Sequence, residues 1–127
     1  AEEAVQAAAQ AIASGDTATA GALMRQARLT HVLDPAVQGL SADLALPDES
    51  QRTEAVLAAY ASRVLAPQFP YSWRRWASIQ ILYGHYGLAH RSLERYFELA
   101  PEARTKDAEA LEWLDKLAHG AVTVAAP

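Results

Sequence analysis

The sequence predicts an all-α protein built from antiparallel helix pairs, and three observations lead to that prediction. Alanine occurs 29 times among 127 residues, against ten Phe, Trp and Tyr together, and alanine has the highest helix propensity of any residue. β-Branched residues are scarce and no long stretch alternates apolar with polar residues, which argues against a sheet. Glycines and prolines mostly separate helically periodic stretches, where they mark turns.

Four helices are expected in the first half of the chain, over about 1–13, 17–32, 35–45 and 50–65. Ser14-Gly15-Asp16 breaks the first helix, and Asp16 or Thr17 caps the second. Pro47 closes the short third helix, and the fourth stops before Pro67.

Three further helices are expected over about 72–83, 86–99 and 103–118. Ser72 would cap the first of them, Gly84 would turn the chain, and Pro101 would close the second. We expect Ala110 on the surface of the last helix. For Trp113 two positions stay open, in the core or half exposed on that helix. The tail 120–127 is too short to fold alone, and we expect it to fray.

Residues 70–103 carry a spaced pattern of large and small side chains. A large aromatic residue is followed four positions later by a small one, then by a turn glycine, a second small residue, a large apolar residue and a closing proline. Small residues let paired helices cross closely while larger neighbours fill the space around them. The pattern resembles the tetratricopeptide repeat (TPR) family, and its positions here are Trp73, Ala77, Gly84, Ala89, Leu93 and Pro101.

The same spacing extends toward the N-terminus. Ala55 lies 34 residues before Ala89, so residues 36–69 resemble a second repeat. Ala20 lies 35 residues before Ala55, so residues 1–35 resemble a first repeat. The alternative is a helical bundle without repeats, because alanine-rich helix pairs produce similar spacings.

Four positions depart from the family pattern. In the second repeat, Gly39 takes the place of the tryptophan and Asp43 that of the small residue. In the third, Gln80 stands where the family prefers an aromatic residue, and Tyr96 where it prefers alanine.

The resemblance implies a single domain over 1–127 that forms a short right-handed solenoid. Its repeats would span about 1–35, 36–69 and 70–103, and a helix over 103–118 would cap the last one, as the end of a solenoid requires. In this family the first helices of the repeats line a concave groove that binds peptides. The partner-binding residues implied here are Leu40, Leu44, Tyr71, Arg74, Arg75 and Ser78.

The net charge of −4 is unevenly distributed. Residues 1–50 and 98–127 are acidic, whereas residues 51–97 hold six arginines against two acids. Arginine at Arg74 and Arg75 would suit a carboxylate or an acidic peptide, because the guanidinium binds such groups in bidentate fashion. The alternative is an internal ion pair between one of these arginines and Glu109 or Glu112. Nucleic acid is not expected as a partner at this charge.

The sequence contains little that suggests catalysis. It has no cysteine, which excludes disulfides and thiolate metal sites, and no two histidines lie three or four apart on a helix. We expect no metal, no cofactor and no enzymatic activity. Its apolar runs are far shorter than a membrane span needs, and no basic region typical of a signal peptide begins the chain.

These observations predict a non-catalytic protein–protein interaction module that docks a partner peptide or helix in a concave helical groove. The alanine- and arginine-rich, lysine-poor composition indicates a bacterial protein, of the cytoplasm or the periplasm. Two alternatives stay open: a self-assembling scaffold, or an accessory domain of a larger enzyme.

Overall fold

Residues 2–119 are described by the structure, a computed structural model, and they contain helices and connecting turns but no strand. The all-α prediction is therefore confirmed for this part of the chain. The expected fraying of the tail 120–127 lies outside the described residues. The chain divides into two units, residues 1–66 and 67–127.

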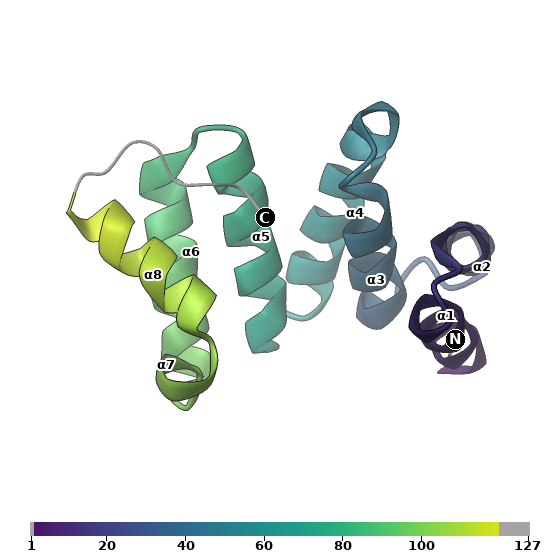
Figure 1. Ribbon diagram of the computed structural model, residues 1–127, viewed down its shortest axis with the longest axis horizontal. Coiled ribbons are helices and arrows are strands. Elements are labelled where there is room, and N and C mark those ends of the chain that lie inside the picture. The colour runs from purple at the N-terminus through teal and green to yellow at the C-terminus, as the bar shows by residue number, and fades with distance from the viewer. Residues whose placement is uncertain (1, 120–127) are drawn as a thin grey trace. The chain divides into compact units, whose positions relative to one another are not determined.

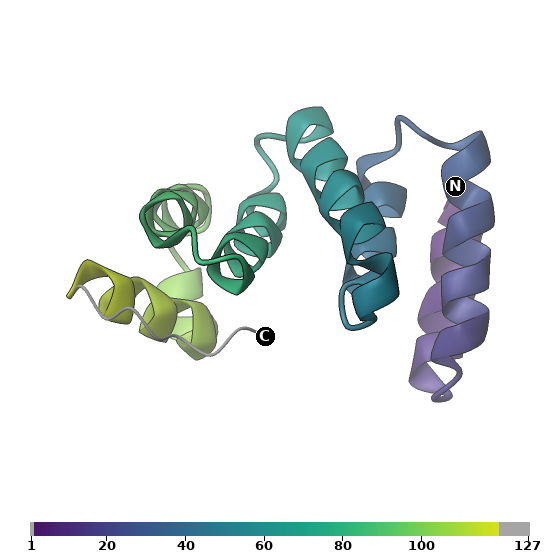
Figure 2. The same ribbon diagram turned by 90° about the horizontal axis from the view of Figure 1, so that it is seen from above.

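The first unit consists of two helix pairs. Its helices are α1 (Glu2–Ala13), α2 (Thr17–Thr30), α3 (Pro35–Ala45) and α4 (Arg52–Leu65), with a short 3₁₀ turn η1 (Glu49–Gln51) before the last. Helix α1 packs beside α2 and α3 beside α4, and α2 also contacts α3 (Figures 1 and 2). Helices α1, α2 and α3 share an apolar core formed by Ala8, Ala20, Met24, Ala27 and Val37.

The second unit is a helix pair with two further helices against it. Its elements are α5 (Pro70–Leu82), α6 (Tyr86–Leu99), α7 (Ala103–Lys106) and α8 (Ala108–Ala118). Helices α5 and α6 lie antiparallel, and α8 packs on α6 (Figure 1). Trp113 of α8 belongs to the same apolar core as Leu93 and Phe97 of α6, so the last helix covers the helix pair.

The first helix of each of two pairs ends in the same turn. Gly15 and Gly84 have φ of 82° and 77°, the left-handed region that favours glycine. The residue after each glycine donates its backbone N–H to the carbonyl five positions back, from Asp16 to Ala11 and from His85 to Gln80, both at 2.8 Å. This is the Schellman ending of a helix. Gly84 lies 69 residues after Gly15, so the same turn recurs.

The buried side chains of these two pairs recur at the same interval. Three pairs of residues, each separated by 69 positions, are at most 1% exposed. One pair consists of alanines on the first helices of the two helix pairs, and another consists of alanines on the second helices. The third consists of large apolar residues on the second helices. The pairs are Ala8 with Ala77, Ala20 with Ala89, and Met24 with Leu93.

Several local expectations were wrong. Helix α5 begins at Pro70 with Phe69 as its N-cap residue, and Ser72 lies buried inside the helix rather than capping it. Ala110 was expected at the surface, but it is 0% exposed. Of the two positions left open for Trp113, the structure shows the core, where the residue is 5% exposed. Their helix turns toward the α5–α6 pair, which buries the face that carries both residues.

The helix expected over 103–118 is interrupted at Asp107, whose φ and ψ are −121° and 76°. Its carboxylate accepts the backbone N–H of Ala110 at 3.1 Å and caps α8. Aspartate favours such caps over helix interiors because its side chain competes for backbone N–H groups. Two helices, α7 and α8, therefore replace the single one.

Candidate functional site

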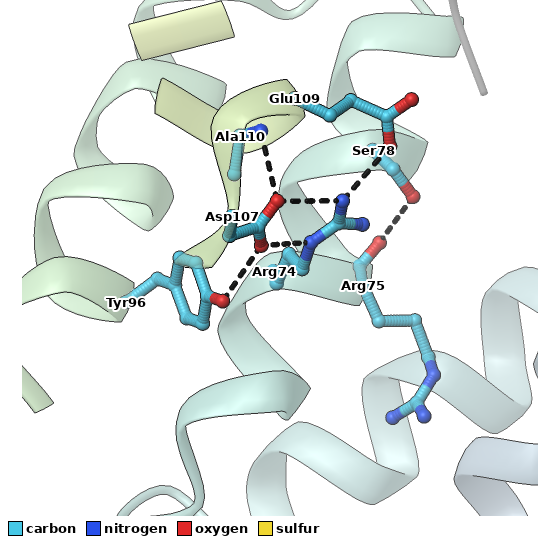
Figure 3. Close-up of polar contacts among 7 residues, drawn as sticks. All are labelled: Arg74, Arg75, Ser78, Tyr96, Asp107, Glu109 and Ala110. Atoms are coloured by element: carbon cyan, nitrogen blue, oxygen red, sulfur yellow. Dashed lines mark hydrogen bonds and ion pairs between the residues drawn. The ribbon is translucent and has the colours of Figure 1, made fainter. Parts of the chain in front are cut away.

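Arg74 joins the first helix of the second unit to the start of its last helix (Figure 3). Its Nε donates to Oδ2 of Asp107 at 2.6 Å, and its Nη2 donates to Oδ1 of Asp107 at 3.2 Å. Nη2 also donates to Oε1 of Glu109 at 2.8 Å. The guanidinium carbon lies 4.9 Å from the centroid of the Trp113 ring. A bidentate, partly buried pair of this kind fixes the orientation of both side chains.

Asp107 is the centre of this cluster, because it also accepts the Tyr96 hydroxyl at 2.7 Å (Figure 3). Burial raises the pKa of Asp107, but the hydrogen bonds from Arg74 and Tyr96 outweigh that effect and lower the pKa to about 2. Asp107 is therefore ionised near neutral pH, and its charge is matched by that of Arg74.

The two partners of Asp107 keep their neutral-pH protonation states over a wide range. Burial and the hydrogen bond to Asp107 raise the pKa of Tyr96 to about 12. Burial opposes the charge of Arg74, but the hydrogen bonds to Asp107 and Glu109 hold its pKa above the ordinary value. The cluster places one guanidinium between two carboxylates and so holds α8 on the helix pair.

Of the residues predicted to bind a partner, Arg74 has an internal role. The alternative of an ion pair with Glu109 is confirmed, whereas Glu112 pairs with Lys116. Arg75 lies with its guanidinium carbon 4.9 Å from the centroid of the Tyr71 ring. Ser78 is buried and donates its hydroxyl to the backbone carbonyl of Arg75 at 2.8 Å.

Leu40 and Leu44 lie on α3 in the first unit, where both are partly buried against its apolar core. Tyr71, Arg74, Arg75 and Ser78 lie on α5 in the second unit. The predicted site residues thus fall into two groups, one in each unit.

An open hollow of about 530 Å³ lies beside Arg74 in the second unit. Phe69 and Tyr71, which are 55% and 42% exposed, contribute aromatic rings to its wall. Ala100 and Ala103 contribute small apolar side chains, and the exposed Glu102 and Lys106 contribute one charge of each sign. Arg74, Tyr96 and Asp107 also line it, so the cluster forms one side of the hollow.

Sequence reasoning missed Asp107, Tyr96, Phe69 and Lys106 as members of this region. A signal for Asp107 was present, because an aspartate followed by a glutamate two positions later is typical of the first turn of a helix. Nothing in the sequence pairs Asp107 with Arg74, which lies 33 residues earlier.

The described residues contain no group of three or more histidine, aspartate or glutamate side chains that would hold a metal ion. Within the same part of the chain, every helix is too short or too polar to cross a bilayer.

Comparison with known protein families and with curated proteins gives no match to this chain. Its function is therefore argued from the geometry of its own residues.

Proposed function

We propose that this chain is a non-catalytic protein–protein interaction module of TPR-like construction, which docks an extended or helical segment of another protein. The repeat part of the proposal is supported by the recurrence, at 69 positions, of one turn and three buried pairs of side chains. In this proposal α1–α2, α3–α4 and α5–α6 are three helical repeats, and α7 and α8 cap the last.

The hollow beside Arg74 carries the functional part of the proposal. Two aromatic side chains, Phe69 and Tyr71, stand half exposed at its wall. Aromatic residues provide large contact areas at small entropic cost, and they dominate binding energy at protein interfaces. A partner segment would place an apolar side chain against these rings and over Ala100 and Ala103.

The charges at the hollow indicate which part of the partner enters it. Arg74 is already held by Asp107 and Glu109, so it orients α8 and Tyr71 rather than receiving an acidic ligand. Because the two carboxylates leave no surplus positive charge at Arg74, the inner side of the hollow favours an apolar anchor. Lys106 and Glu102 both line the hollow and carry opposite charges, so a polar residue fits beside that anchor.

The proposal is tested by selecting binders from a random peptide library on the immobilised full chain. Peptides with an aromatic or large aliphatic anchor are expected, and the affinity of the strongest is measured by fluorescence anisotropy. Phe69→Ala and Tyr71→Ala should each weaken binding by about tenfold or more, as for anchors of an interface.

Tyr83→Ala is the matched control, because Tyr83 is 51% exposed in the same unit but does not line the hollow. Equal losses for Tyr71→Ala and Tyr83→Ala, or no enriched peptide, would contradict the proposal.

Self-association is a second candidate function, favoured by one observation. Helix α4 exposes Leu57, Tyr60 and Val64, at i, i+3 and i+7 along one face, at 62%, 49% and 53%. Such a row is suited to a neighbouring helix. Light scattering over a range of concentrations decides this candidate, because a strict monomer excludes it.

A further inference from the structure

The two arginines of the acidic N-terminal segment meet at one small cavity. Residues 1–50 contain seven acidic residues and only Arg25 and Arg28 as bases. Both arginines line a cavity of about 20 Å³ in the first unit, together with Ser41 of α3 and Gln51. A cavity of this size accommodates one atom as large as a water oxygen.

Ser41 presents an unsatisfied hydroxyl at this cavity. Its side chain is 6% exposed, and its Oγ makes no hydrogen bond within the described residues. Buried hydroxyl groups are almost always hydrogen-bonded. An oxygen atom placed in the cavity, from a water molecule or a ligand, would accept a hydrogen bond from this hydroxyl.

The two arginines differ in how they are held. Arg28 donates from Nη1 to Oε1 of Glu54 at 2.7 Å and from Nε to Oε1 of Gln38 at 3.2 Å. Arg25 has no acidic partner among the residues that the structure describes. Its Nη1 lies 3.6 Å from the position that a Cβ on Gly21 would take, so its guanidinium lies along α2 at the edge of the cavity.

We propose that this cavity binds a carboxylate of a partner protein, with one oxygen accepting a hydrogen bond from the Ser41 hydroxyl and the Arg25 guanidinium binding the carboxylate from the open side. The inference rests on the proposed function, since a partner protein supplies the carboxylate. It also moves the binding of an acidic group, which the sequence predicted at Arg74, to Arg25.

A carboxylate fits this place better than a phosphate group. The cavity admits one oxygen atom. A carboxylate can place one of its two oxygens in the cavity and keep the other outside, beside Arg25. The carboxylate of Glu54 lines the same cavity, and it repels a doubly charged phosphate more strongly than a singly charged ligand.

The test titrates sodium acetate and N-acetylglutamate into the full ¹⁵N-labelled chain at constant ionic strength. Saturable NMR shifts are expected at the Ser41 amide and the Arg25 Nε–H group, and phosphate should bind more weakly than acetate. Ser41→Ala and Arg25→Gln should each weaken binding by about tenfold, as expected for a hydrogen bond to a charged group.

Two controls keep this test decisive. Arg91→Gln removes the same charge from an exposed position in the second unit and should leave the affinity for acetate unchanged. Ser41→Ala removes a hydroxyl without a partner, so its melting temperature should stay equal or rise while binding falls.

Absence of saturable shifts, tighter binding of phosphate, or equal affinity in wild type and Ser41→Ala would each overturn the carboxylate site. Peptide docking at Phe69 and Tyr71 is measured in the other unit with other variants. Failure of one proposal is therefore distinguishable from failure of the other.

Discussion

Nε of Arg74 lies 2.6 Å from Oδ2 of Asp107, although 33 residues separate them along the chain. The contact joins α5 to the first residue before α8, and the same carboxylate caps α8 through the Ala110 N–H group. One side chain thus ends α7, starts α8 and docks it on the helix pair. The stability of the second unit should depend on Asp107 more than on any other helix cap.

Asp107→Asn should lower the free energy of unfolding by about 1 to 3 kcal/mol. Asparagine caps a helix about as well as aspartate does, so the loss reports the contacts of the carboxylate with Arg74 and Tyr96 and not the cap. Urea unfolding followed by circular dichroism measures it. Asp16→Asn is the control, because Asp16 caps α2 from an exposed position. Similar losses at both positions would show that the pair contributes little.

The pH dependence of stability should reveal the same pair. The pKa of Asp107 is about 2 in the folded chain, below its ordinary value near 3.8. A lowered folded-state pKa stabilises the protein above the unfolded-state value, and that stabilisation disappears as pH falls toward 2. Between pH 5 and pH 2, the free energy of unfolding of the wild type should therefore fall by about 1 to 2 kcal/mol more than that of Asp107→Asn. Parallel curves would contradict the assignment.

Overpacking should be equally harmful at two alanines that are 69 residues apart. Ala20 and Ala89 are both fully buried at a helix crossing. Leucine at either position should lower stability by about 1 to 3 kcal/mol. Ala22→Leu is the matched control, because Ala22 lies on the same helix as Ala20 but is exposed, and it should change stability little. Tolerance of leucine at one alanine but not the other would argue against equivalent helix pairs.

Two neighbouring glycines should respond to alanine in opposite directions. Gly84 has a φ of 77° and a Cβ there would meet no atom within 4 Å, so Gly84→Ala is costly through backbone conformation alone, by about 1 kcal/mol. Gly87 lies in α6 with open space around it, so Gly87→Ala should stabilise by about 0.5 to 1 kcal/mol. Thermal melting of the two variants, with shifts of opposite sign expected, checks this.

The helices were largely predictable because local signals mark their ends. Gly15, Gly84 and Pro101 stop helices through their own backbone restrictions, and these act without reference to the rest of the chain. The crossings at Ala20 and Ala89 were also predictable, since both lie at a fixed distance from a turn glycine.

One register in the second helix pair was wrong by a single residue. The repeat spacing placed Asp43 where the pattern has a small residue, but Asp43 is exposed and the neighbouring Ala42 is 1% exposed. Thirteen positions separate Ala42 from Ala55, whereas twelve separate Ala77 from Ala89. The longer connection before α4, which contains η1, carries the extra residue. Counting a fixed number of residues back from Ala55 in α4 therefore reaches Asp43 instead of Ala42 in α3.

The candidate site was less predictable because it depends on contacts between distant residues. Arg74 and Arg75 look alike in sequence, yet Arg74 binds Asp107 and Glu109 while Arg75 lies over Tyr71. The break before α8, which places Asp107 beside Arg74, results from a helix cap rather than from apolar periodicity. Helical periodicity alone did not indicate either the break or the hollow beside it.

Peptide contact with the hollow is the central claim, and intermolecular nuclear Overhauser effects test it most directly. A selected peptide with labelled methyl or aromatic groups is bound to the full chain. We predict contacts from its anchor side chain to the rings of Phe69 and Tyr71 and to the methyl group of Ala103. Contacts confined to Leu57 and Val64 of α4, with none to the hollow, would contradict the account.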